Sequence, residues 1–106
     1  MDLKAESTAV PGPAIRLEGE VDIHTAPRIR KMLLKAARRG QIRAMEVDFS
    51  AVSHIDTSCI AVLVELVRAL KARGATLRLT GFDRNAARMI SLAALDSIFE
   101  GMIFPR

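Results

Sequence analysis

The sequence has no tryptophan or tyrosine, one cysteine and no long apolar run. The lone Cys59 excludes an internal disulfide and suits a reducing compartment. The longest apolar run, CIAVLV, is far shorter than the roughly 18–20 residues that a membrane-spanning helix needs. The first residues, MDLKAES, lack the basic region and apolar stretch of a secretory signal. We therefore expect a cytoplasmic protein that does not insert into the membrane.

What is present suffices for one domain over residues 1–106, because half of the residues are apolar. The formal charge of +4 is unevenly distributed, since no acidic residue occurs between His24 and Met45. That stretch holds seven cations: Arg28, Arg30, Lys31, Lys35, Arg38, Arg39 and Arg43. Such a stripe attracts acidic proteins, phosphates or anionic lipid, although a solvated helix face is its commoner origin. Nucleic acid is not expected as a partner, because no aromatic residue is interleaved with these cations.

Apolar periodicity predicts strands that alternate with helices. The expected elements are a strand in AIRLEGEV, a helix capped by Thr25 and ended by Gly40, a strand over 42–49, a helix over 58–73, a strand over 75–82, a short helix capped by Asp83, and a weak strand in SIFEGMIF. The N-terminal segment before the turn VPGP is expected to pair with AIRLEGEV as a hairpin. The prediction is an α/β fold with a central mixed sheet and helices packed mainly on one face.

A short polar segment, HIDTSC, separates the strand over 42–49 from the helix over 58–73. Asp56 or Thr57 is expected to cap this helix, which leaves the hydroxyl of Ser58 free at the first turn. A phosphate on Ser58 would meet backbone N–H donors and the positive end of the helix dipole. It would also lie near Asp56 and, if the preceding strand packs alongside, near Asp22. The pattern predicts a switch in partner binding rather than a change of fold.

The first two turns of this helix are apolar nearly all round. Cys59 and Val62 flank the stripe that should face the sheet, while Ala61 and Glu65 lie on the outer face. These turns are either covered by another element or belong to a docking surface.

The sequence gives little support for a catalytic site or a metal site. Ser58 has no G-x-S-x-G elbow, and His54 lies too near it in sequence to promise the geometry of a general base. Burial would raise the pKa of the Cys59 thiol and make it unreactive. His24, His54 and Cys59 fall on different elements and do not form a metal site, and no glycine-rich loop suits a nucleotide. We expect a binding module without cofactor or metal, not an enzyme.

The block VDFSAVSHIDTSCIAVLVELVRALKARGATLRLTGF resembles the central part of a STAS domain, as found in bacterial anti-sigma factor antagonists. LEGEVDIHTA is similar to the upstream element of that family, L-x-G-E-L-D-x-x-T. The resemblance implies an antagonist that binds a switch kinase acting as an anti-sigma factor, with phosphorylation falling on Ser58 beside Thr57. Asp22 and Asp56 match the two acids of the family motifs.

Cys59 stands where this family usually has glycine, and its side chain is expected to narrow the approach of a kinase to Ser58. The expected partner contacts are Asp22, His24, Asp56, Thr57, Ser58, Cys59, Ala61, Val62 and Glu65. Two alternatives are binding modules of the same fold. One is a STAS subunit of a lipid-transport ABC system, which needs no kinase, and whose work near an anionic membrane the basic first helix would suit. The other is a subunit of a stressosome-like scaffold.

Overall fold

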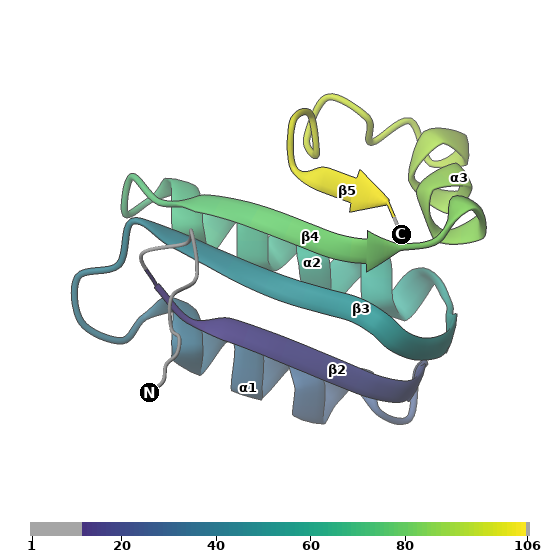
Figure 1. Cartoon of the computed structure of the whole chain (residues 1–106), viewed down its shortest axis with the longest axis horizontal. Helices are drawn as coiled ribbons and strands as arrows, with labels where there is room; N and C mark the ends of the chain where they lie inside the picture. Colours follow the sequence, from purple (N-terminus) through teal and green to yellow (C-terminus); the bar gives the residue numbers. More distant parts are fainter. Residues whose placement is uncertain (1–11, 106) are drawn as a thin grey trace.

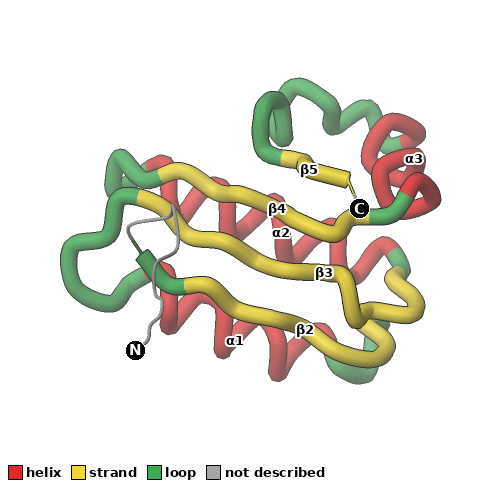
Figure 2. Tube along the Cα trace, viewed as in Figure 1, coloured by secondary structure: helices red, strands yellow, loops and turns green. Residues whose placement is uncertain are grey.

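A computed structural model describes residues 12–105 of the chain. Its elements, in chain order, are β2 (Ala14–Val21), α1 (Ala26–Ala37), β3 (Ala44–Ile55), α2 (Thr57–Lys71), β4 (Thr76–Phe82), α3 (Arg84–Leu92) and β5 (Ile103–Pro105). The four strands form one sheet in the order β2-β3-β4-β5 (Figures 1 and 2). Each neighbouring pair is parallel, because a helix crosses over between successive strands.

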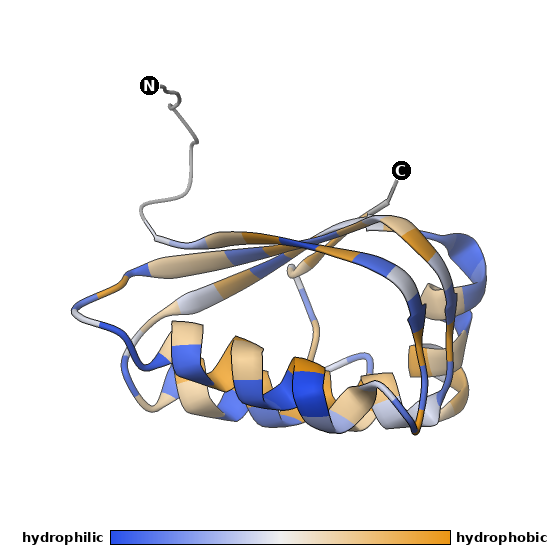
Figure 3. Cartoon of the chain, turned by 90° about the horizontal axis from the view of Figure 1, so that it is seen from below, coloured by the Kyte–Doolittle hydropathy of each residue, from blue (hydrophilic) through white to orange (hydrophobic). Residues whose placement is uncertain are grey.

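The predicted α/β class is confirmed. α1 and α2 lie side by side against one face of the sheet, and α3 lies at the end where β4 finishes (Figures 1 and 3). The opposite face carries none of the described helices. The hairpin that was expected to make the sheet mixed involves the N-terminal segment, which lies outside the described residues.

β3 is longer than expected. The strand predicted over 42–49 continues to Ile55, through the segment SAVSHI. Against β2 the register shifts twice, and each shift places one extra residue on β3. Such bulges bend a strand and interrupt its alternation of apolar and polar residues, so the sequence pattern resembles a loop here. Gly81 accommodates the bend, since a Cβ at this position would lie 2.6 Å from the Ser50 backbone nitrogen.

The start of α1 also differs from the prediction. Thr25 occupies the N-cap position, but its side chain does not cap the helix. Its hydroxyl instead donates to the Glu20 carbonyl at 3.0 Å and accepts from the Asp22 N–H at 3.0 Å. Thr25 therefore stabilises the turn between β2 and α1 rather than the first turn of the helix.

The core lies between the sheet and the helices. Leu33 of α1, Leu63 and Leu66 of α2, and Met45 and Val47 of β3 are fully buried there. Among the described residues no polar or charged residue is buried. Burial of this apolar layer fixes the two helices on the sheet and so determines where their N-termini lie.

Candidate functional site

The candidate site is built on Asp56, which joins two segments of the chain. Its Oδ1 atom accepts a hydrogen bond from the Ser58 N–H at 2.8 Å and caps α2. Its Oδ2 atom accepts from the Ile23 N–H at 3.2 Å, in the turn between β2 and α1. The Asp56 N–H donates to the Val21 carbonyl at 3.2 Å. The structure thus confirms the predicted cap and brings the Asp22 turn beside the start of α2.

The turn over residues 22–25 is stabilised by hydrogen bonds to the Asp22 carboxylate. Asp22 Oδ1 accepts from the backbone N–H groups of His24, at 2.9 Å, and Thr25, at 3.1 Å. The hydrogen bond from the Thr25 N–H is the largest cause that lowers the pKa of Asp22 below its usual value. Asp22 is therefore ionised near neutral pH, and its carboxylate accepts both hydrogen bonds of the turn. The His24 side chain is exposed on this turn.

Ser58 lies in the first turn of α2 and is half-buried. Within residues 12–105 its hydroxyl forms no hydrogen bond. Asp56 uses the Ser58 backbone, not its side chain, so capping the helix leaves the hydroxyl free. Thr57 precedes it and is exposed. The hydroxyl of Ser58 is therefore available for modification or for contact with a partner.

Two of the expected contact residues face the core. Cys59 is 2% exposed and Val62 is 7% exposed, so neither side chain is accessible to a protein docking on this surface. The prediction that they belong to the contact surface is wrong for this conformation. Cys59 belongs to the core cluster, and the narrowing that it was expected to cause around Ser58 stays a prediction. Burial raises the pKa of the Cys59 thiol to about 12, with a smaller contribution from the charge of Asp56.

The outer face of α2 next to Ser58 is formed by Ala61 and Glu65, as expected. The sequence did not reveal that Glu65 is paired. Arg30 of α1 donates to both of its carboxylate oxygens, with the Nε–Oε1 pair at 2.7 Å. The side-chain hydrogen bond from Arg30 lowers the pKa of Glu65. Glu65 thus ties α1 to α2 at the edge of the site.

Ile23 is a residue of the site that sequence reasoning missed. Its side chain is 67% exposed, while its backbone N–H is fixed by Asp56. The signal in the sequence was an apolar residue between two polar ones, Asp22 and His24, at the end of a strand. An apolar side chain held on a fixed turn beside Ser58 offers a partner an anchoring contact.

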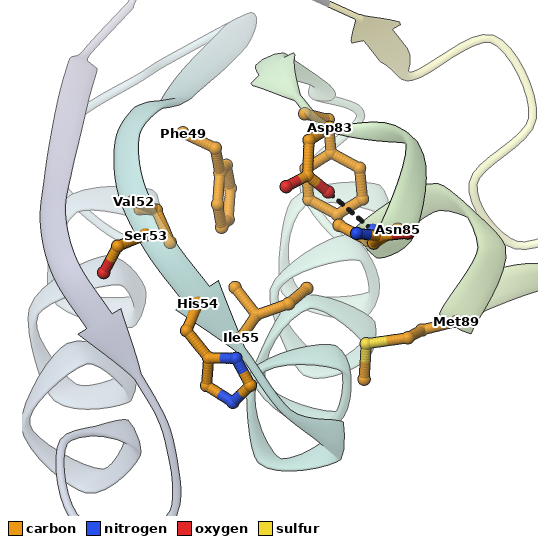
Figure 4. Close-up of a pocket in the computed structure, with 10 residues that line it drawn as sticks. Phe49, Val52, Ser53, His54, Ile55, Asp83, Asn85 and Met89 are labelled. Carbon is orange, nitrogen blue, oxygen red and sulfur yellow. Dashed lines mark hydrogen bonds between the residues drawn. The ribbon is translucent and has the colours of Figure 1, made fainter.

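A pocket of about 260 Å³ lies between the end of β3 and the start of α3 (Figure 4). It is lined by Phe49, Val52, Ser53, His54, Ile55, Phe82, Asp83, Asn85, Ala86 and Met89. The floor is apolar, with the rings of Phe49 and Phe82 in an edge-to-face contact at 4.9 Å. Polar side chains form its rim, among them His54 (Figure 4). The sequence did not predict this pocket.

Within the described part of the chain, no three His, Cys, Asp or Glu residues are grouped so that they could hold a metal ion. None of the described helices is long and apolar enough to cross a membrane.

The chain is similar in sequence to two proteins described as anti-sigma-B factor antagonists. The protein from Bacillus subtilis (strain 168) is 24% identical over 86 residues, which cover 81% of this chain and 77% of that protein. The protein from Listeria monocytogenes serovar 1/2a is 28% identical over 87 residues, which cover 81% of this chain and 75% of that protein.

Solved structures share the fold. The anti-sigma factor antagonist SpoIIAA in its unphosphorylated form superimposes with a TM-score of 0.70 at 20% identity, covering 94% of this chain and 86% of that one. A sulfate transporter family protein from Wolinella succinogenes superimposes with a TM-score of 0.72 at 21% identity, covering 92% of this chain and 80% of that one. The sequence pattern of the STAS domain matches residues 4–106. The chain therefore belongs to the STAS domain family.

Proposed function

We propose that this protein is an anti-sigma factor antagonist, a cytoplasmic binding module without enzymatic activity. In this proposal it binds an anti-sigma factor that is also a serine kinase, and phosphorylation of Ser58 ends the interaction. Support comes from the curated relatives described as anti-sigma-B factor antagonists. The proposed contact surface comprises Asp22, Ile23, His24, Asp56, Thr57, Ser58, Ala61 and Glu65.

The observation that carries the proposal is the free hydroxyl of Ser58 at the first turn of α2. Asp56 already caps the helix through the Ser58 backbone, so the fold does not need this hydroxyl. A phosphate on it would lie at a helix N-terminus, which favours negative charge. The helix therefore tolerates the modification. SpoIIAA, which shares the fold, has been solved in a phosphorylated form.

The same phosphate would change the surface. It adds a charge of about −2 beside Asp56 and the turn that carries Asp22. A partner that docks on the neutral hydroxyl and on Ile23 would then have to desolvate a phosphate without a matching cation, which is unfavourable. Phosphorylation would thus act on binding, whereas the fold is unchanged.

The test is affinity capture from the native cells, with mass spectrometry of the co-purifying proteins and of the Ser58 peptide. The baits are the wild type, Ser58→Ala, Ser58→Asp and, as a matched control, Ser97→Asp at an exposed serine outside the site. We expect an ATP-binding protein on the wild type, Ser58→Ala and Ser97→Asp, and its absence from Ser58→Asp. Equal capture by Ser58→Ala and Ser58→Asp would contradict the switch.

A STAS subunit of a transport system is the second candidate. It is favoured by the likeness to a sulfate transporter family protein, which at 21% identity concerns the fold alone. For this candidate, capture should yield a permease and an ATPase, with Ser58 unmodified. A subunit of a lipid-transport ABC system should give the same result, because its partners are also a permease and an ATPase.

A further inference from the structure

The outer surface of the helix layer carries almost only positive charge. Apart from Pro27 and Met32, every exposed side chain of α1 is a cation. The cations of this surface, all exposed, are Arg28, Arg30, Lys31, Lys35, Arg38 and Arg39, together with Arg68 of α2. Within the two helices, as the structure describes them, Glu65 is the only acid, and Arg30 already neutralises it.

Several of these cations converge. Arg30, Lys31, Lys35, Arg38 and Arg39 line a shallow hollow of about 560 Å³. Its floor is the buried Leu34. The like charges repel one another, and the one acid nearby is already paired. This repulsion destabilises the isolated chain, and it decreases when an anionic surface approaches.

The opposite face of the sheet carries charges of both signs. Glu18, Glu46 and Asp48 lie on it together with Arg16 and Arg78, since the residues that alternate with them face the helices. The Arg78 Nε atom is 3.6 Å from Glu46 Oε1, and its guanidinium carbon lies 4.0 Å from the centre of the Phe104 ring. The molecule is therefore electrically asymmetric, with its excess of positive charge on the helix side. A negatively charged surface would orient it with α1 and α2 towards that surface.

From this asymmetry we propose that the outer surface of α1 binds the anionic phospholipid surface of a membrane. Long flexible stems carry the charges, as a fluid layer of phosphate headgroups requires. Met32, 43% exposed among the cations, can reach the acyl boundary. The surface offers no aromatic side chain on which a base could stack. With little apolar area to insert, the binding is peripheral and weakens with salt.

The probe is a vesicle of equimolar phosphatidylglycerol and phosphatidylcholine, compared with pure phosphatidylcholine, in a sedimentation assay with the full chain. The charge-reversal variant is Lys31→Glu with Lys35→Glu. Its matched control is Arg84→Glu with Arg88→Glu, which changes the net charge equally at exposed positions of α3. Circular dichroism establishes that both variants are folded.

We expect the wild type to bind the anionic vesicles and not those of pure phosphatidylcholine. The α1 variant should bind the anionic vesicles at least about thirtyfold more weakly, because two cation contacts with the headgroups are lost. The α3 variant should lose far less. The proposal is overturned if the wild type ignores anionic vesicles, if both variants lose equally, or if the chain binds a DNA duplex and not the vesicles. None of these outcomes depends on Ser58, so the proposed function is tested separately.

Discussion

Two helices of this protein begin in the same way and do different things. α2 and α3 each follow a parallel strand, and each starts with an aspartate that caps it. Asp83 accepts from the Ala86 N–H at 2.7 Å within its own turn. Asp56 accepts from Ser58 and also from Ile23, 33 residues earlier in the chain. A cap alone begins a helix, whereas a cap shared with a second turn builds a composite surface.

The largest effect should come from charge at the residue two positions after each cap. Ser58→Asp places a carboxylate in the proposed interface and should weaken binding of the co-purified partner by about a hundredfold or more, because a desolvated charge is left unpaired. Asn85→Asp, at the equivalent position of α3, should leave the affinity unchanged. Isothermal titration calorimetry measures both. A similar loss in both variants would mean that the two helix starts are not distinct in function.

The two caps should also differ in stability. Asp56→Ala loses the cap and the bond to Ile23, and we expect a decrease of about 2 kcal/mol in the free energy of unfolding. Asp83→Ala loses only a local cap, at about 1 kcal/mol. Urea unfolding followed by circular dichroism gives both values. If they are equal, the bond between Asp56 and Ile23 does not stabilise the fold.

Exposed apolar residues beside the two helices sharpen the comparison further. Ile23→Ser should reduce partner affinity about tenfold, because an anchoring apolar contact is lost. Leu92→Ser is the matched control, since Leu92 is 77% exposed at the end of α3. Isothermal titration calorimetry measures the affinity of both variants for the partner. Full affinity with Ile23→Ser would place the interface elsewhere on the α2 start.

The smallest effect concerns pH. The pKa of Asp22 is lowered in the folded state, so its ionised form stabilises the fold above its unfolded pKa, near 3.8, and this contribution is lost as the pH falls through the folded pKa. Asp22→Asn cannot ionise. Its unfolding free energy should therefore lie below that of the wild type near neutral pH and approach it in acid. A gap that is constant with pH would exclude this role for the carboxylate.

The sequence predicted what is local. Asp56 and Asp83 each precede a helix with apolar residues at helical spacing, so both caps could be read from neighbouring residues. The contacts that complete the site join distant residues: Ile23 with Asp56, and Arg30 with Glu65. The bulges of β3 were missed because they break strand alternation. Cys59 and Val62 were wrongly counted among the contact residues because an apolar turn looks the same whether it is covered or exposed.

The most direct test of the switch follows the complex itself. The purified complex of this protein with its captured partner is supplied with ATP and followed by native mass spectrometry, with the phosphorylated residue located by peptide analysis. We predict that one phosphate appears on Ser58 and that the complex dissociates as it does so, whereas a Ser58→Ala complex persists. A complex that survives with phosphate on Ser58, or that dissociates with Ser58 unmodified, would contradict the account.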